Sequence, residues 1–172
     1  MSDGSLVSVQ IVDTSGQERF TALNERYFKI ADCCLLVYDI TNINTFKECQ
    51  YYSKEIKSRC KKNINVILLG NKTDLESKRK VPPEKGARFD LENRYIFMET
   101  SCFKNTNVAK AFETLIEITY RDYQKKNTIK RVNSRIIINS KNHTKRGKEK
   151  KEKKCWNNYL LNKKIIYPIF KI

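Results

Sequence analysis

The sequence has little of what metal sites, secreted scaffolds and membrane spans require. It holds 1 His and 6 Cys, and the cysteine spacings match no zinc-binding pattern. The first residues form neither the basic start nor the apolar run of a secretion signal, so we expect a cytoplasmic protein with reduced thiols. No apolar stretch approaches the roughly 18 residues of a membrane-spanning helix. These absences argue against a zinc module, a disulfide-stapled domain and a membrane-spanning protein.

Glycine is also scarce, and a motif that depends on it is absent. None of the 5 glycines begins the phosphate-binding motif G-x-x-x-x-G-K-[ST]. In that motif backbone N–H groups cradle phosphates, the Lys meets their charge and the Ser or Thr holds Mg²⁺. A nucleotide site built from this sequence alone would lack all of these groups.

Positive charge is abundant but unevenly distributed. Residues 125–172 contain 16 Lys or Arg and 2 Glu, so they carry +14 of the formal net charge of +16. The excess therefore describes a tail and says little about the preceding part of the chain. Because the tail is rich in Lys and Asn and shows no clear period, we expect it to be disordered. The predicted organisation is a partial domain at residues 1–124 and a basic, disordered tail at residues 125–172.

Short apolar runs alternate with segments of helical spacing. Each run leads into polar residues, which is typical of strands covered on both faces of a parallel sheet. Apolar side chains recur at helical spacing in residues 46–56 and 108–119, and Pro82-Pro83 favours the start of another helix. The pattern predicts an α/β fold with a mostly parallel sheet and flanking helices. The four expected strands are residues 6–12, 33–38, 66–69 and 95–98.

Three polar loops follow predicted strands. Asp13-Thr14-Ser15-Gly16-Gln17-Glu18 follows the first strand, Asn71-Lys72-Thr73-Asp74 the third, and Glu99-Thr100-Ser101-Cys102 the fourth. Ligands of open α/β sheets bind at the carboxyl ends of the strands, so these loops are candidates for one shared site. Each of these short patterns alone is common by chance, and for any one of them an ordinary polar turn is by far the more frequent explanation. Their joint occurrence, in this order and each at a strand end, favours a functional site.

These loops carry a resemblance to the Ras superfamily of GTP-binding switches, and within it to the Rab branch. The Rab likeness depends on VQIVDTSGQERF at residues 9–20, RYFKIA at residues 26–31 and LVYDIT at residues 36–41. It covers about residues 3–123 of the chain. The resemblance implies a P-loop NTPase-like small G domain, here lacking the first strand and the phosphate loop. It also implies GTP or GDP with Mg²⁺ as ligands, and a role in vesicle trafficking.

The resemblance implies that one half of the site reads guanine. The Asp74 carboxylate would accept two hydrogen bonds from the ring N–H and amino group, a pairing that adenine does not offer. Asn71 and the aliphatic stem of Lys72 would shape the base pocket. Ser101 and the backbone N–H of Cys102 would complete it.

The other half would handle the phosphates. Asp13 would hold Mg²⁺ through a water, the backbone N–H of Gly16 would sense the γ-phosphate, and Gln17 would orient the attacking water as the catalytic residue. Residues 18–30, from Glu18 to Ile30, would form the second switch, which meets effectors and regulators. Members of the family hydrolyse GTP. We expect impaired binding and hydrolysis here, because the Lys and Ser/Thr of the phosphate loop are absent.

The free energies of the expected hydrogen bonds indicate that the base pocket alone binds a guanine nucleotide weakly. Two charge-assisted hydrogen bonds from Asp74 contribute about 3–6 kcal/mol, and about 4 kcal/mol corresponds to millimolar affinity.

In the family the missing strand lies between the strand ending at Val12 and the strand ending at Tyr38. We therefore expect a gap one strand wide in the sheet, and poor folding of the isolated chain.

Two alternatives to a nucleotide switch stay open. One is a non-catalytic interaction protein that uses the second-switch surface. The other is a tail-mediated binder of anionic membranes or of RNA, without specific nucleic-acid recognition. No prenylation motif is seen at the end of the sequence, and we expect a cytoplasmic protein at the cytosolic face of endomembranes. The Lys, Asn, Ile and Tyr content of the tail also fits a truncated gene model.

Overall fold

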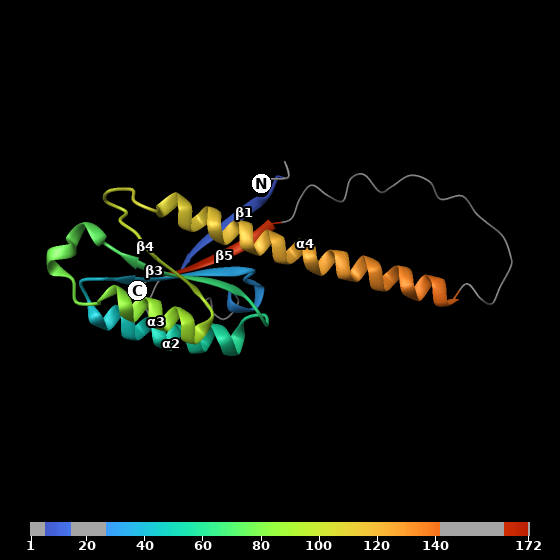
Figure 1. Cartoon of the computed structure of the whole chain (residues 1–172), viewed down its shortest axis with the longest axis horizontal. Coiled ribbons are helices and arrows are strands. Elements are labelled where there is room, and N and C mark those ends of the chain that lie inside the picture. Colours follow the sequence, from blue (N-terminus) through green and yellow to red (C-terminus); the bar gives the residue numbers. More distant parts are fainter. Residues whose placement is uncertain (1–5, 15–26, 142–163, 172) are drawn as a thin grey trace.

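The computed structural model describes residues 6–14, 27–141 and 164–171 (Figure 1). Its strands form a five-stranded sheet of order β1-β5-β2-β3-β4, in which every neighbouring pair is parallel. The predicted α/β fold with a parallel sheet is thereby confirmed. The strands are β1 (Ser8–Thr14), β2 (Cys33–Asp39), β3 (Asn65–Asn71), β4 (Ile96–Glu99) and β5 (Lys164–Lys171).

Helices cover both faces of the sheet, α2 and α3 on one and α4 on the other (Figure 1). Alternate residues of β2 face the two layers: Leu36 packs in a core cluster with Phe46 of α2 and Phe89 of α3. Leu35 packs with Leu115 of α4. This burial on both faces explains the continuous apolar run of β2. The helices are α2 (Ile43–Arg59), α3 (Pro83–Asn93) and α4 (Val108–Lys141), with a 3₁₀ helix η2 (Thr73–Lys78) after β3.

Helix ends follow the local sequence. The Asn42 side chain accepts the backbone N–H of Asn44 at 3.0 Å and so caps the start of α2. Helix α3 begins at Pro83, where proline costs no hydrogen bond, and it ends before Arg94, which has a left-handed φ of 59°. None of the described helices is long and apolar enough to cross a membrane.

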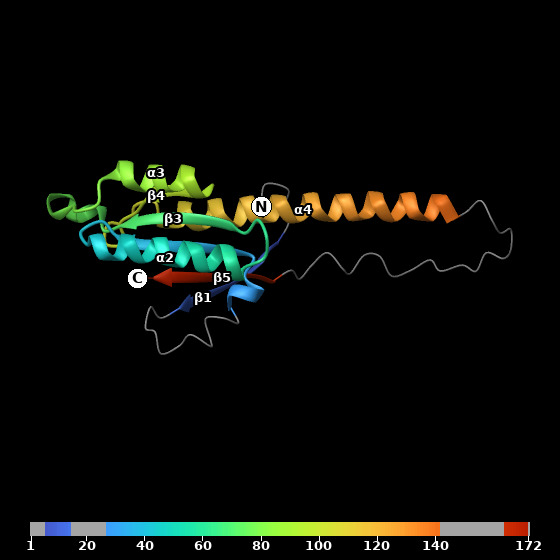
Figure 2. The ribbon, with the colours of Figure 1, turned by 90° about the horizontal axis from the view of Figure 1, so that it is seen from below.

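The structure differs from two expectations about the sheet and the tail. The slot between β1 and β2, expected to be a gap, is occupied by β5, the red strand of Figures 1 and 2. Within the tail expected to be disordered, α4 continues to Lys141 and residues 164–171 form β5. Residues 142–163 lie outside the described residues. Strand β5 occupies the slot for a physical reason: a short apolar segment there pairs backbone groups of β1 and β2 that would otherwise be unsatisfied.

Candidate functional site

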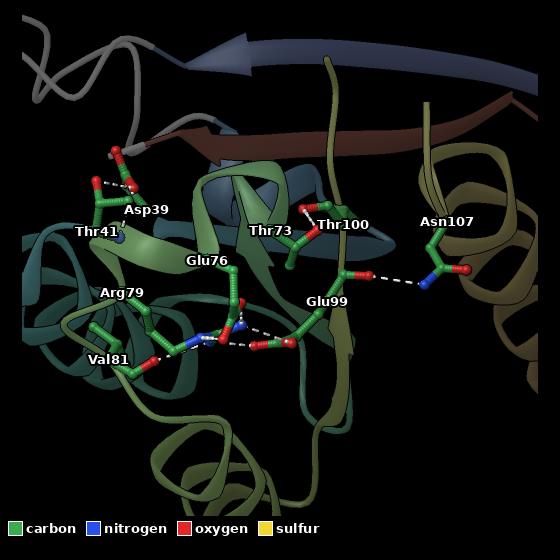
Figure 3. A network of polar contacts seen from close by, with 9 residues as sticks. All are labelled: Asp39, Thr41, Thr73, Glu76, Arg79, Val81, Glu99, Thr100 and Asn107. Carbon is green, nitrogen blue, oxygen red and sulfur yellow. Dashed lines mark hydrogen bonds and ion pairs between the residues drawn. The ribbon is translucent and has the colours of Figure 1, made fainter. Parts of the chain in front are cut away.

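The carboxyl ends of four strands meet at one edge of the sheet. Asp13, Asp39, Asn71 and Glu99 lie at the ends of β1, β2, β3 and β4, and all four strands run in the same direction. The loops after β3 and β4 are tied together, because Thr73 donates both its backbone N–H (3.2 Å) and its hydroxyl (3.1 Å) to the carbonyl of Thr100 (Figure 3). The two loops are thus connected to each other at the edge where α/β proteins bind ligands.

Asp74 and Ser101, predicted as partners in base recognition, are in direct contact. The buried Ser101 hydroxyl donates a hydrogen bond of 2.5 Å to Asp74 Oδ1, and its oxygen accepts the backbone N–H of Lys104 at 3.0 Å. The short contact fixes the orientation of the carboxylate. An oriented, half-exposed carboxylate is what bidentate recognition of two N–H donors requires.

Asn71 links the same two loops through its side-chain amide. Its Oδ1 accepts the Thr100 hydroxyl and the backbone N–H of Cys102, each at 3.3 Å. The Cys102 residue itself is exposed. The Cys102 backbone N–H, assigned to the base pocket by the resemblance, therefore donates to Asn71 in this structure.

Lys72 adopts a left-handed backbone conformation with φ 73°, and its Nζ lies 2.5 Å from Asp39 Oδ2. Asp39 also accepts the backbone N–H (2.8 Å) and the hydroxyl (2.7 Å) of Thr41. Burial raises the pKa of Asp39, but the hydrogen bonds from Lys72 and Thr41 outweigh burial and hold that pKa below its usual value. The ion pair joins the Lys72 side chain to the end of β2.

A pocket of about 240 Å³ lies beside these loops on the α4 side of the sheet. Asp13, Asn71, Thr100 and Cys102 form its polar wall. The structure therefore brings Asp13, the predicted Mg²⁺ residue, to the same cavity as two base-pocket residues. The apolar wall consists of Leu35, Val37, Leu69, Val108 and Phe112.

Other predicted site residues are not placed together. Gly16, Gln17 and residues 18–26 of the second switch lie outside the described residues, whereas residues 27–30 are helical. Within the part of the chain that the structure describes, no three His, Cys, Asp or Glu side chains cluster closely enough to hold a metal ion. The single carboxylate of Asp13 nevertheless suits the water-mediated contact with Mg²⁺ that the resemblance implies.

Sequence reasoning missed a polar network beneath the site. Arg79 donates from Nε and Nη2 to Glu76, both at 2.7 Å, and from Nη1 and Nη2 to Glu99, at 2.7 and 3.1 Å (Figure 3). It also donates to the Val81 carbonyl at 3.0 Å, and Asn107 donates to the Glu99 carbonyl at 2.9 Å. These contacts fasten η2 and α4 to β4. In the sequence, the one indication of this network was an acidic residue, Glu99, at the end of a predicted strand. Its partner Arg79 could be identified only from the fold.

Comparisons with known proteins agree with the geometry. A sequence model of the Ras family matches residues 1–121. The chain is 40% identical over 121 residues to the Ras-related protein RABA4b of Arabidopsis thaliana, covering 70% of this chain and 54% of that protein. It is 40% identical over 127 residues to the Ras-related protein RGP1 of Oryza sativa subsp. japonica, covering 74% and 56%. For the Ras-related protein RABA1b of Arabidopsis thaliana the identity is 42% over 124 residues, covering 72% and 57%. The chain spans about half the length of the curated relatives it matches.

Proposed function

Because this chain belongs to the Ras family and is of the Rab type, we propose that it binds guanine nucleotides at the carboxyl edge of its sheet. The observation that carries the proposal is the 2.5 Å hydrogen bond by which Ser101 orients Asp74. The free face of that carboxylate accepts the ring N–H and amino group of guanine. Asn71, the stem of Lys72 and the backbone N–H of Cys102 line the base pocket.

The half of the proposed site that faces the phosphates has fewer binding groups than the half that faces the base. Asp13 would hold Mg²⁺ through a water, and Gly16 and Gln17 would act on the γ-phosphate and the attacking water. The 172 residues contain no G-x-x-x-x-G-K-[ST] to clamp the phosphates. We therefore propose that this chain by itself binds GTP and GDP at about millimolar affinity and does not turn GTP over steadily.

A second candidate function is a partner-binding role without nucleotide cycling. It is favoured by the absence of the phosphate motif from a sequence that keeps the base-reading loops. Residues 18–30 would then meet effectors or regulators of vesicle trafficking at the cytosolic face of endomembranes. Contact of the basic residues 125–172 with anionic lipid would support such a location.

Nucleoside binding tests the primary proposal. Ligand-observed NMR of the full chain with guanosine, GDP and adenosine measures millimolar affinities directly. We expect guanosine and GDP to bind within a few-fold of each other, adenosine to bind at least about tenfold more weakly, and Asp74→Ala to remove guanosine binding. Asp90→Ala on α3 is the matched control and should bind as the wild type does.

Two results would count against the proposal. Equal binding of adenosine and guanosine would refute guanine recognition by Asp74. Submicromolar GDP affinity of this same chain would refute the weak phosphate half, because it would require phosphate contacts that the sequence does not supply.

A further inference from the structure

Strand β1 is attached to the sheet through β5. All seven of its residues, Ser8–Thr14, are in register with residues 164–170, and within the described residues no other strand pairs with β1. Figure 2 shows β1 and β5 side by side, away from β3 and β4. The backbone pairing that connects β1 to β2, β3 and β4 therefore runs through a strand from the far end of the chain.

The pairing between β5 and β2 is short. It comprises residues 169–171 of β5 with residues 35–37 of β2, whereas β2 pairs with β3 over residues 33–39. It is also the shortest strand pairing in the described sheet, since β3 and β4 pair over residues 67–70 of β3. This seam between β5 and β2 thus has the fewest register pairs of the ladder.

Two further features limit how firmly β5 is attached to its neighbours. Among the described elements, the substantial contacts of β5 are with β1 and β2, while α2, α3 and α4 pack on β2, β3 and β4. Pro168 lies within β5, and proline has no backbone N–H to donate to a neighbouring strand. Successive residues of a strand donate to opposite sides, so Pro168 withholds one bond from one of its two neighbours.

The same connection carries a functional residue. Asp13 is the register partner of Ile169, and it lines the pocket shared with Asn71 and Cys102. Asn71 ends β3 and Cys102 lies in the loop after β4, so both belong to the part of the fold on which the helices pack. Val7 and Val9 also pack against the core cluster on the α4 side of the sheet, but the backbone ladder that connects Asp13 to β2 runs through β5.

We propose that β5 is a positioning strand: residues 164–171 dock in the slot between β1 and β2 and thereby hold Asp13 at the site. Opening of the β5–β2 seam separates Asp13 from the base-reading loops without dismantling those loops. The slot is a docking site for residues 164–171, and it also accepts the same segment as a free peptide. The effect on nucleotide binding rests on the proposed function, whereas the structural coupling does not.

Hydrogen exchange of the full chain tests the coupling without any ligand. Ile169→Pro removes a donor on the side opposite to that affected by Pro168, so β5 would lose donors toward both neighbours. We expect exchange of residues 8–14 to accelerate at least about tenfold, while residues 65–71 of β3 stay within about twofold of the wild type. Ile172→Pro, just beyond β5, is the matched proline control and should leave β1 protected. Pro168→Ala should preserve or increase protection.

A peptide of residues 164–172 supplies the rescue. Added to the Ile169→Pro chain, it should restore protection of residues 8–14, and the same peptide with Ile169→Pro should not. If Ile169→Pro unfolds β3 as well, Ile169→Gly weakens the strand more gently and is tested in the same way. Wild-type protection of residues 8–14 in both variants, or failure of the peptide to restore lost protection, would overturn the proposal.

Measurements of nucleotide affinity test this inference separately from the proposed function. In the Ile169→Pro chain, guanosine affinity should stay within about twofold, whereas any Mg²⁺-dependent gain in GDP affinity should disappear. Retention of that Mg²⁺-dependent gain would count against the positioning role of β5. A wild-type chain that fails to bind guanosine refutes the proposed function instead, and the exchange experiment still decides the coupling.

Discussion

Lys72 Nζ lies 2.5 Å from Asp39 Oδ2, and this ion pair joins the loop after β3 to the end of β2. The Asp39 side chain is only 16% exposed, so the pair lies at the boundary between the core and the site. Thr41 supplies two further hydrogen bonds to the same carboxylate. Together these contacts hold Lys72 where the proposed base pocket needs its aliphatic stem.

The Asp39 contacts predict a dependence of stability on acid pH. The pKa of Asp39 is lower in the folded chain than its usual value of about 3.9, so its contribution to stability is complete above that value. It is lost as the pH falls through the lower, folded pKa. We expect Asp39→Asn to cost roughly 0.5–1 kcal/mol of the free energy of unfolding at pH 7. The deficit should shrink as the pH falls below about 4.

Urea unfolding over a series of pH values measures this effect. Asp90→Asn on α3 serves as the matched substitution, for which we expect no comparable cost at neutral pH. A wild-type advantage over Asp39→Asn that is equally large at neutral and strongly acid pH would contradict the assignment.

Arg79 should contribute more to stability than any exposed arginine of the described helices. Its side chain is 12% exposed, and removing it leaves Glu99, itself 27% exposed, without an ionic partner. We expect Arg79→Ala to cost about 2–3 kcal/mol. The stability of Arg79→Lys should fall between that of Arg79→Ala and that of the wild type. An ammonium group cannot make the paired hydrogen bonds that the guanidinium group makes to two carboxylates.

Arg88→Ala is the control for that comparison. Arg88 pairs with Glu92 on α3, but the two side chains are 83% and 57% exposed. Such a pair contributes less than about 1 kcal/mol. Unfolding in guanidinium chloride measures the difference. Equal midpoints for Arg88→Ala and Arg79→Ala would show that the Arg79 ion pairs add no stability beyond that of an exposed pair.

Gly70 and Tyr38 should be energetically coupled across β3 and β2. A Cβ at residue 70 would lie 2.8 Å from Tyr38 Oη and 3.0 Å from Tyr38 Cζ, so Gly70→Ala overpacks the core and should cost about 1–3 kcal/mol. Tyr38 Oη is buried and has no hydrogen-bond partner in the described structure. Tyr38→Phe should therefore be neutral or stabilising by up to about 1 kcal/mol.

A double-mutant cycle of thermal unfolding measures this coupling. In the Tyr38→Phe background the cost of Gly70→Ala should fall by roughly 1 kcal/mol, because the hydroxyl that the new methyl meets has gone. Strict additivity of the two changes would mean that the clash is relieved elsewhere.

The cysteines should react in a sharply graded order. Cys102 is exposed at the site, whereas Cys34 and Cys49 are fully buried. Burial raises the pKa of Cys60 to about 11, although Lys61 opposes the shift, so its thiolate is scarce at pH 8. Among the five cysteines that the structure describes, mass spectrometry after brief alkylation should find Cys102 modified first and the buried thiols only after unfolding. Early modification of Cys34 would indicate that the core opens readily.

The sequence predicted the four strands that are flanked by helical segments, but not β5. Residues 165–170 are a short apolar run like the others, yet Pro168 and the surrounding Lys and Asn favour a disordered tail. What makes the run a strand is the slot between β1 and β2, which is a property of the folded sheet. The length of α4 was also underestimated, although no Gly or Pro interrupts residues 108–141.

In the site, motif reasoning identified residues but not all of their partners. Ser101 and Asp74 were assigned to one implied base pocket, but the hydrogen bond between them was not predicted. The contacts of Lys72 with Asp39, and of Arg79 with Glu99, join loops from different strands. Their geometry depends on sheet register and on the turn of η2, and neither can be read from local spacing.

The outer edge of β1 has a consequence for solubility. No strand of the described structure pairs with that edge, and residues 8–14 contain neither Lys nor Pro, which commonly protect an open edge. Ile11 on this strand is 52% exposed. A second molecule can add its own strand there, so self-association of the purified chain should increase steeply with protein concentration.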